Sequence, residues 1–298
     1  MKSPSTLTPE EVDQFIYSGY IKLSDCFDVD LAASLVSKAY QRLGYDPDDP
    51  STWKREIDYL DHHNKFPIRD IAPRAWGAIC DVLGGENRIR RDVFSIGRTI
   101  HFSSVDSFNW SDAFIINFKY GATSPWKPPS ADTSGWHIDG GYFRHFLDSP
   151  EQALLIVAYW TDVDHKGGGT FVAPDSVTPV AHKLLEHTEG IDFAGFGDLV
   201  SECRNFQELV GKAGDVFICH PFVLHTSSPN HSNRPRFMSN PPIALQNPMC
   251  FNRKDPKSYS PLEYSILQAL KVDRLDFRPT GRRELLFSES LRKRRMTF

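Results

Sequence analysis

The sequence predicts a β-rich α+β protein whose strands form a jelly roll with helices at both ends of the chain. Three observations support this prediction: helical patterns come first, many short strand-like segments follow, and one helical pattern comes last. No internal repeat or low-complexity segment interrupts this order. Closing short antiparallel strands into a double-sheet jelly roll removes exposed edges and leaves a mouth for a ligand. We therefore expect one domain that spans residues 1–298.

Helical patterns dominate residues 1–112. Thr8-Pro9-Glu10-Glu11 is typical of a helix start, with an N-cap, a proline in the first turn and two acidic residues, and the helix should end at Gly19. Apolar residues recur every fourth position over 28–43, which predicts a second helix. A third helix is expected at 75–83.

Residues 44–70 differ in composition, because three prolines interrupt a mixture of aromatic and polar side chains. Long loops inside compact domains are commonly functional, so we expect a lid or wall over an active site. His62 and His63 are adjacent, and adjacent side chains in a loop more often point apart. This argues against a metal site at that pair.

Short strands fill the centre of the chain, which we expect to form a jelly-roll core over residues 113–246. The near-continuous apolar run at 153–160 is typical of a strand that is covered on both faces. Strands are expected at 20–23, 113–120, 153–160, 169–174, 214–219 and 236–245, the last broken near Pro241-Pro242, with a helix inserted at 179–188. Residues 247–298 form a C-terminal extension with a helix at 261–271.

The segment Trp136-His137-Ile138-Asp139-Gly140-Gly141 holds the first candidate ligands. Two residues apart on a strand, His137 and Asp139 point to the same face. His225, on a later strand, would complete a 2-His-1-carboxylate triad, which binds non-haem Fe(II) and leaves positions open for co-substrate and O2. His220 lies at an odd offset from His225 and should point to the opposite face, where we expect it to be packed or hydrogen-bonded. Arg234 and Arg236 follow, and either guanidinium could bind a carboxylate with its two-pronged fork.

Several of these segments, at residues 136–142, 167–176 and 214–236, resemble the phytanoyl-CoA dioxygenase-like family of Fe(II)/2-oxoglutarate-dependent oxygenases. The opening from Leu7 to Ile21 resembles the start of that family. The resemblance implies a double-stranded β-helix (a cupin-like jelly roll). It implies Fe(II) at the triad, with 2-oxoglutarate and O2 consumed and succinate and CO2 released. The substrate would be a small organic molecule that is hydroxylated, desaturated or rearranged, as in secondary metabolism.

Family spacing after the second histidine favours Arg236 over Arg234 as the residue that holds the far carboxylate of 2-oxoglutarate. Thr170 is expected to add a hydroxyl to that carboxylate. Asn117 or Lys119 is expected to contact the other end of the co-substrate. Iron halogenases of this superfamily replace the carboxylate ligand with glycine or alanine, so Asp139 argues against halogenation.

The substrate pocket is expected where the chain leaves the barrel mouth after the motif. Its candidate residues are Trp53, Phe66, Trp126, Tyr142, Phe143 and Arg144. The aromatic side chains predict a partly apolar substrate, and Arg144 would meet an anionic group on it.

Composition and charge limit the partners and the compartment that we expect for this protein. The net charge of −4 argues against a broad nucleic-acid surface, and the basic run at 292–295 is expected to be a solvated tail. The five cysteines form no CxxC pair, which suits a reducing cytosol and argues against disulfides and structural zinc. No run of residues approaches the length of a membrane span. We expect a cytoplasmic protein with no membrane partner, and a homodimer is the candidate assembly.

Two alternatives stay open on the sequence alone. One is a jelly-roll protein that binds a small molecule without turnover, although a binder has no need for the triad and the arginines together. The other is a zinc hydrolase that uses His137, Asp139 and His225, since zinc accepts the same ligands. Such a hydrolase would have no use for a carboxylate-binding arginine.

Overall fold

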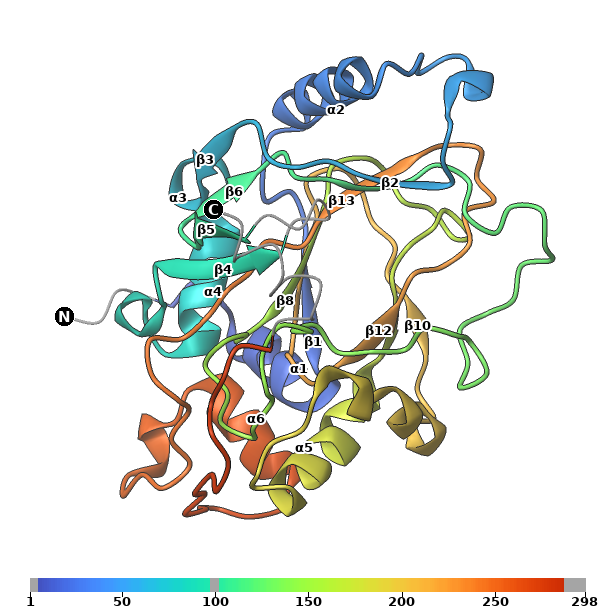
Figure 1. The fold of residues 1–298 in the computed structure, drawn as a ribbon. Helices are drawn as coiled ribbons and strands as arrows, with labels where there is room; N and C mark the ends of the chain where they lie inside the picture. Colours follow the sequence, from blue (N-terminus) through green and yellow to red (C-terminus); the bar gives the residue numbers. More distant parts are fainter. Residues whose placement is uncertain (1–4, 97–101, 287–298) are drawn as a thin grey trace, which may run out of the picture.

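Two antiparallel sheets form the centre of the computed structural model, which describes residues 5–96 and 102–286 (Figure 1). The larger sheet has the strand order β1-β11-β8-β13-β7-β2, and the smaller has the order β10-β9-β12. The larger sheet consists of β1 (Tyr20–Leu23), β11 (Val216–Cys219), β8 (Leu155–Tyr159), β13 (Arg236–Ser239), β7 (Ile115–Asn117) and β2 (Ile57–Tyr59). The smaller consists of β10 (Gln207–Glu208), β9 (Phe171–Ala173) and β12 (Leu224–Thr226).

Two separate pairs of strands and a set of helices surround these sheets. The pairs are β3 (Lys65–Pro67) with β6 (Asn109–Ser111), and β4 (Asp92–Ile96) with β5 (Phe102–Asp106). The α-helices are α1 (Pro9–Ser18), α2 (Val29–Leu43), α3 (Ile68–Ile71), α4 (Pro73–Leu83), α5 (Val177–Glu186) and α6 (Pro261–Ala269). Short 3-10 helices lie at Pro50–Thr52, Glu86–Arg88, Pro174–Ser176, Phe193–Gly195, Gly197–Glu202 and Pro256–Ser258. No helix in these ranges is long and apolar enough to cross a bilayer.

The predicted helix start at Thr8 is confirmed in detail. Thr8 and Glu11 form a reciprocal capping box, which satisfies two backbone N–H groups that the helix itself leaves unpaired. Gly19 ends the helix with a φ of 72°, a left-handed conformation that glycine adopts without a Cβ clash. The helix buries Phe15 completely. Helix α6 contacts α1, α4 and α5, so the helices pack on one another as well as on the sheets.

Residues 44–112 contain more strand than the sequence indicated. The expected loop at 44–70 includes β2, which extends the larger sheet by pairing Ile57 with Asn117. Strands β3 to β6 also lie in the part that was expected to be mainly helical. These strands are only three to five residues long. Segments of that length carry too little periodicity to be recognised, and pairing partners decide their conformation.

The strand predicted at 236–245 is interrupted at the prolines where a break was expected. Strand β13 ends at Ser239, and Pro241-Pro242 follow, whose nitrogen atoms cannot donate to a ladder. Beyond them only single bridges continue, from Ile243 to Leu154 and from Leu245 to Ile89. The basic run at 292–295 lies outside the described residues.

One buried carboxylate ties α6 to distant parts of the chain. Glu263 is fully buried, and its carboxylate oxygens accept hydrogen bonds from Arg88 at 2.6 Å and from Arg253 at 2.9 Å. It also accepts the backbone N–H groups of Cys250 and Ser260. Burial alone would raise the pKa of Glu263, but the hydrogen bonds from Arg253 and Arg88 lower it below its ordinary value.

We expect Glu263→Gln to lower the free energy of unfolding by about 2–3 kcal/mol at pH 7, because two arginines lose their counter-charge. The ionised carboxylate stabilises the fold above the pKa of the unfolded chain, about 4.3, and this contribution disappears as the pH falls through the lower folded value. Urea titrations at pH 7 and at lower pH would therefore show the gap between variant and wild type closing on acidification. Asp276→Asn, which removes an exposed partner of Arg278, is the control and should cost less than about 0.5 kcal/mol. A comparable loss in both variants would contradict this account.

Candidate metal centre

A reciprocal backbone pair brings two histidines together. The His137 N–H donates to the His225 carbonyl at 3.1 Å, and the His225 N–H donates to the His137 carbonyl at 2.9 Å. Directly opposed residues of an antiparallel pair project their side chains from the same face. The two imidazole centroids are accordingly 4.4 Å apart. Strand β12 carries His225 and pairs with β9 on its other side, so the register of the smaller sheet fixes this histidine.

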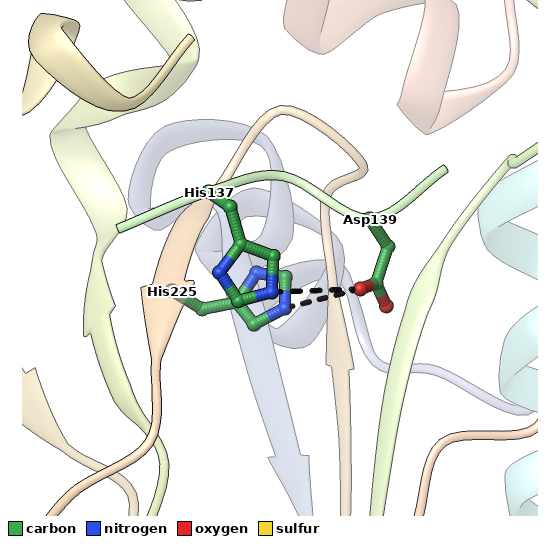
Figure 2. A group of neighbouring side chains, drawn as sticks. All are labelled: His137, Asp139 and His225. Atoms are coloured by element: carbon green, nitrogen blue, oxygen red, sulfur yellow. Dashed lines mark ion pairs between the residues drawn. The ribbon is translucent and has the colours of Figure 1, made fainter. Parts of the chain in front are cut away.

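Asp139 completes the cluster, as Figure 2 shows. Its Oδ1 atom is 3.8 Å from His137 Nε2 and 3.5 Å from His225 Nε2. The three candidate ligand atoms lie within 4.8 Å of one another, and within the described ranges no other trio of histidine, cysteine or acidic side chains does so. Ligand atoms held at about 2.0–2.2 Å from one ion and at right angles are about 3 Å apart. A small contraction would therefore let all three atoms bind one metal ion.

The Nδ1 atoms, which do not face Asp139, orient both histidine rings through hydrogen bonds. Nδ1 of His137 is 2.7 Å from the Gly135 carbonyl oxygen, and Nδ1 of His225 is 3.2 Å from the Val223 carbonyl oxygen. A carbonyl oxygen only accepts hydrogen bonds, so each Nδ1 carries the proton. In the neutral tautomer each Nε2 then directs a lone pair toward the Asp139 carboxylate. Three electron-rich atoms facing one another require a cation between them, and this is how metal-binding histidines are typically held.

The charges in the cluster agree with that requirement. Burial would raise the pKa of Asp139, but His225 and His137 lower it to about 2, so the carboxylate is ionised at neutral pH. Burial and the neighbouring His225 lower the pKa of His137, which keeps its imidazole neutral. Burial would lower the pKa of His225, but Asp139 raises it. A metal ion would replace the proton that Asp139 attracts to His225.

The turn after Asp139 depends on glycine. Gly140 has a φ of 105°, and a Cβ atom there would lie 2.3 Å from the ring of Phe143. The Gly140 carbonyl is held by Nε2 of the buried His145 at 3.0 Å. Only His137 of the motif is paired as in a strand, because the chain bends at Asp139. The motif is thus a single bridge followed by a fixed turn.

A cavity of about 790 Å³ opens beside the three ligands. Both sheets contribute to it, through Ile115 of β7, Val157 of β8 and Met238 of β13 from the larger sheet, and Thr226 of β12 from the smaller. Its lining residues are Tyr59, Leu60, Asp61, His62, Lys65, Asp106, Asn109, Ser111, Ala113, Phe114, Ile115, His137, Asp139, Leu155, Val157, Thr170, His225, Thr226, Ser227, Arg236, Met238, Ser239, Asn240, Pro241 and Pro242.

Arg236 lines this cavity and is 3% exposed. Its Nε atom has no hydrogen-bond partner, and no carboxylate in the described part of the chain pairs with its guanidinium. Burial lowers the pKa of Arg236 from its ordinary value. Thr170 is buried in the same cavity wall. A buried guanidinium without a counter-ion is costly, so this end of the cavity is suited to an anion.

The other expected co-substrate residues do not line the cavity. Arg234 is exposed and pairs with Asp164, because the turn before Pro235 directs it to the surface. Lys119 is also exposed. Asn117 is buried, but its amide donates to the Ser228 carbonyl at 2.9 Å and accepts the Tyr120 N–H at 3.0 Å. Its polar atoms therefore hold two loops together instead of facing the cavity.

The six residues expected to form the substrate pocket do not line this cavity. Trp53 is buried with its ring 5.2 Å from that of Phe118, and Trp126 packs at 4.7 Å against His165. The remaining four are Phe66, which packs on the core from β3, Tyr142 and Phe143, whose rings pack on each other, and Arg144, which pairs with Asp192 and Glu284. Aromatic rings gain more from core burial than from lining an open cavity.

The segment at 53–66 nevertheless contributes to the cavity through different residues. Its wall is formed by 59–62 and Lys65, and β6 adds Asn109 and Ser111. The composition of 44–70 predicted a wall here but did not single out these residues, because side chains in a short irregular segment are usually just solvated. His220 is buried between Phe15 and Phe222 and accepts the Phe222 N–H with Nδ1. It faces the core and takes no part in the metal cluster.

Comparison with known structures found several of similar fold. The carbocyclase SnoK from nogalamycin biosynthesis, described as non-heme and alpha ketoglutarate dependent, is 14% identical, with 82% of this chain and 87% of that chain covered and a TM-score of 0.47. EctD from S. alaskensis in its apoform is 16% identical, with 82% and 78% covered and a TM-score of 0.43. AviO1 from Streptomyces viridochromogenes Tue57 is 15% identical, with 82% and 95% covered and a TM-score of 0.42. No curated protein sequence matches the chain.

The model of the phytanoyl-CoA dioxygenase (PhyH) family matches residues 17–238. This span includes both sheets, the His-Asp-His cluster and Arg236. The predictions of the family and of the jelly-roll core are confirmed, and the binding-protein and zinc-hydrolase alternatives are not favoured. The chain belongs to the phytanoyl-CoA dioxygenase family and is an oxidoreductase of the Fe(II)/2-oxoglutarate-dependent oxygenases.

Proposed function

We propose that this oxygenase hydroxylates a small organic molecule, with Fe(II) bound by His137, Asp139 and His225. Arg236 binds the far carboxylate of 2-oxoglutarate in the same cavity. One observation carries this proposal: a buried guanidinium without a carboxylate partner lines the cavity into which three metal-ligating atoms converge. A dicarboxylate that binds the metal at one end would supply the missing counter-charge at the other.

The donor set fits iron. Two imidazole nitrogens and one carboxylate oxygen on one side of an ion make the facial arrangement typical of non-haem Fe(II) oxygenases. When bound, Fe(II), 2-oxoglutarate and O2 supply the oxidising chemistry, with release of succinate and CO2. The residues of the chain hold the ion, orient the co-substrate and bring the target C–H bond to it.

The Arg236 end of the cavity is built to orient a carboxylate. The planar guanidinium offers paired N–H donors to both oxygens of a carboxylate. Leu155, Val157 and Met238 line the cavity nearby on β8 and β13 and make its surroundings less polar. In such low-polarity surroundings the attraction between guanidinium and carboxylate is stronger than in water. Thr170 places a hydroxyl in the same wall and would add a hydrogen bond.

The substrate would occupy the part of the cavity that is lined by residues 59–65 and 106–115 and by Pro241 and Pro242. A cavity of about 790 Å³ is of the size that holds a small ligand. Its walls combine apolar residues such as Phe114 with polar ones such as His62. We infer a substrate with an apolar body and polar substituents, which hydroxylation, or else desaturation or rearrangement, would convert.

The experiment that tests the function is an anaerobic titration of the metal-free protein with Fe(II) and then 2-oxoglutarate. The proposal predicts a visible charge-transfer band that bleaches when O2 is admitted, together with release of succinate. His225→Ala should weaken metal binding by more than about 100-fold and abolish the band. His220→Gln is the control, because it replaces a nearby histidine that is buried in the core, and this variant should retain metal binding and the band. A band of full intensity in His225→Ala would remove this residue from the metal site.

We expect Arg236→Ala to weaken 2-oxoglutarate binding by about 3 kcal/mol, or roughly 100- to 200-fold, because one partner of a buried charge pair is removed. Iron affinity should change little. Calorimetric titration of the metal-free protein with Fe(II) measures the affinity for iron, and titration of the Fe(II)-loaded protein with 2-oxoglutarate measures the affinity for the co-substrate. Arg234→Ala is the matched control, since that arginine is exposed and paired with Asp164, and it should change the affinity less than twofold. Equal losses in the two variants would refute Arg236 as the carboxylate-binding residue.

Residues 59–65 line the part of the cavity that we assign to the substrate. A substitution there should therefore affect substrate binding and leave co-substrate binding unchanged. We expect His62→Ala to raise the KM for the substrate about tenfold and to leave the Kd for 2-oxoglutarate unchanged. Molecules that shift the visible band of the iron and 2-oxoglutarate complex identify the substrate for this measurement. Trp53→Phe, at a buried position outside the cavity, serves as the control. An unchanged KM in His62→Ala would show that this part of the wall does not contact the substrate.

A further inference from the structure

The two oxygens of Asp139 have different surroundings. Oδ1 faces the Nε2 atoms of both histidines, at 3.8 and 3.5 Å. Oδ2 accepts a hydrogen bond from the side-chain amide of Asn240 at 3.3 Å. A side-chain hydrogen bond from Gln152 also helps to lower the pKa of Asp139. Oδ1 thus faces the metal position, while Oδ2 is hydrogen-bonded to a neutral amide.

Asn240 is brought to this position by β13. Side chains alternate along a strand, so Arg236 and Met238 share one face of β13. Asn240 directly follows the strand, and all three side chains line the cavity. Phe237 points the other way, into the core. The end of the strand is anchored by Ser239, whose hydroxyl accepts the Trp160 indole N–H at 2.9 Å. Pro241 and Pro242 follow directly and restrict the backbone beyond Asn240.

We propose that Asn240 is a positioning residue that makes Asp139 bind the metal through Oδ1 alone. This inference rests on the proposed function of the triad. A carboxylate can bind a metal through one oxygen or through both. Binding through both would take a coordination position that 2-oxoglutarate or O2 needs. An amide donor bonded to Oδ2 opposes the rotation that would bring this oxygen to the metal.

An amide suits this role better than other donors. It stays neutral at every pH, so it does not compete with the metal for the charge of Asp139. It can donate where an aspartate at the same position could only accept, although the two side chains have nearly the same shape. Asn240 is partly exposed to the cavity, so its truncation removes the donor without leaving a void in the core.

The test uses Co(II) in place of iron, because its visible spectrum reports coordination number and geometry without turnover. We expect Asn240→Ala and Asn240→Asp to bind Co(II) about 10- to 100-fold more weakly than wild type and to show an altered spectrum. Asn240→Asp should show the larger change, because it replaces the donor with a second negative charge. Asn109→Ala, an asparagine in the same cavity without contact to Asp139, should bind Co(II) with the wild-type spectrum. Thermal unfolding monitored by circular dichroism checks that each variant is folded.

The outcomes separate this proposal from the proposed function. Wild-type Co(II) spectra in both Asn240 variants would overturn the role of Asn240, whatever their affinities, and would leave the triad intact. Failure of the wild-type protein to bind Co(II) or Fe(II) would overturn the proposed metal site itself. A changed spectrum in Asn240→Ala, with the wild-type spectrum in Asn109→Ala, would support the positioning role.

Discussion

The reciprocal backbone pair between His137 and His225 is the constraint on which the candidate site depends. Its two hydrogen bonds, at 3.1 and 2.9 Å, join segments that are far apart in the chain. On its other side β12 is paired with β9, where His225 lies opposite Val172. A slip of one residue in either pairing would turn an imidazole to the wrong face. The backbone pairing of His225 with His137 and with β9 therefore sets the positions of both histidines.

Two unbalanced charges in one cavity give this site its chemistry. The Asp139 carboxylate and two imidazole lone pairs face a common point and require a cation. Arg236, on the larger sheet, is a buried cation that requires an anion. No described carboxylate pairs with Arg236, and in the metal cluster only a proton on His225 would balance Asp139. A metal-bound dicarboxylate would meet both requirements. Strand β13 links the two ends, because its cavity face carries Arg236 and ends beside Asn240, which contacts Asp139.

What the sequence could predict was encoded in short patterns with a definite geometry. The capping box at Thr8, the His137-x-Asp139 spacing and a later histidine each have a physical meaning that needs no tertiary information. The choice between Arg236 and Arg234 already needed the family spacing, since only the strand after Pro235 turns one inward and leaves the other on the surface. A wall at 44–70 was expected, but the residues of that segment that line the cavity were not. Trp53 is buried and does not line the cavity, whereas His62, which follows β2, does.

The placement of the cavity residues in the fold is consistent with a family that identifies the class of oxygenase and not its substrate. The candidate metal ligands and Arg236 lie within or beside the jelly-roll sheets, where register and core packing hold them. Another part of the cavity wall comes from residues 59–65 and from β6, which lies in a separate two-stranded sheet with β3. Substitutions there would alter the shape and polarity of the cavity without moving the backbone pair of His137 and His225. The same oxidising site can therefore serve different substrates, because function in such folds is set by the loops around a fixed scaffold.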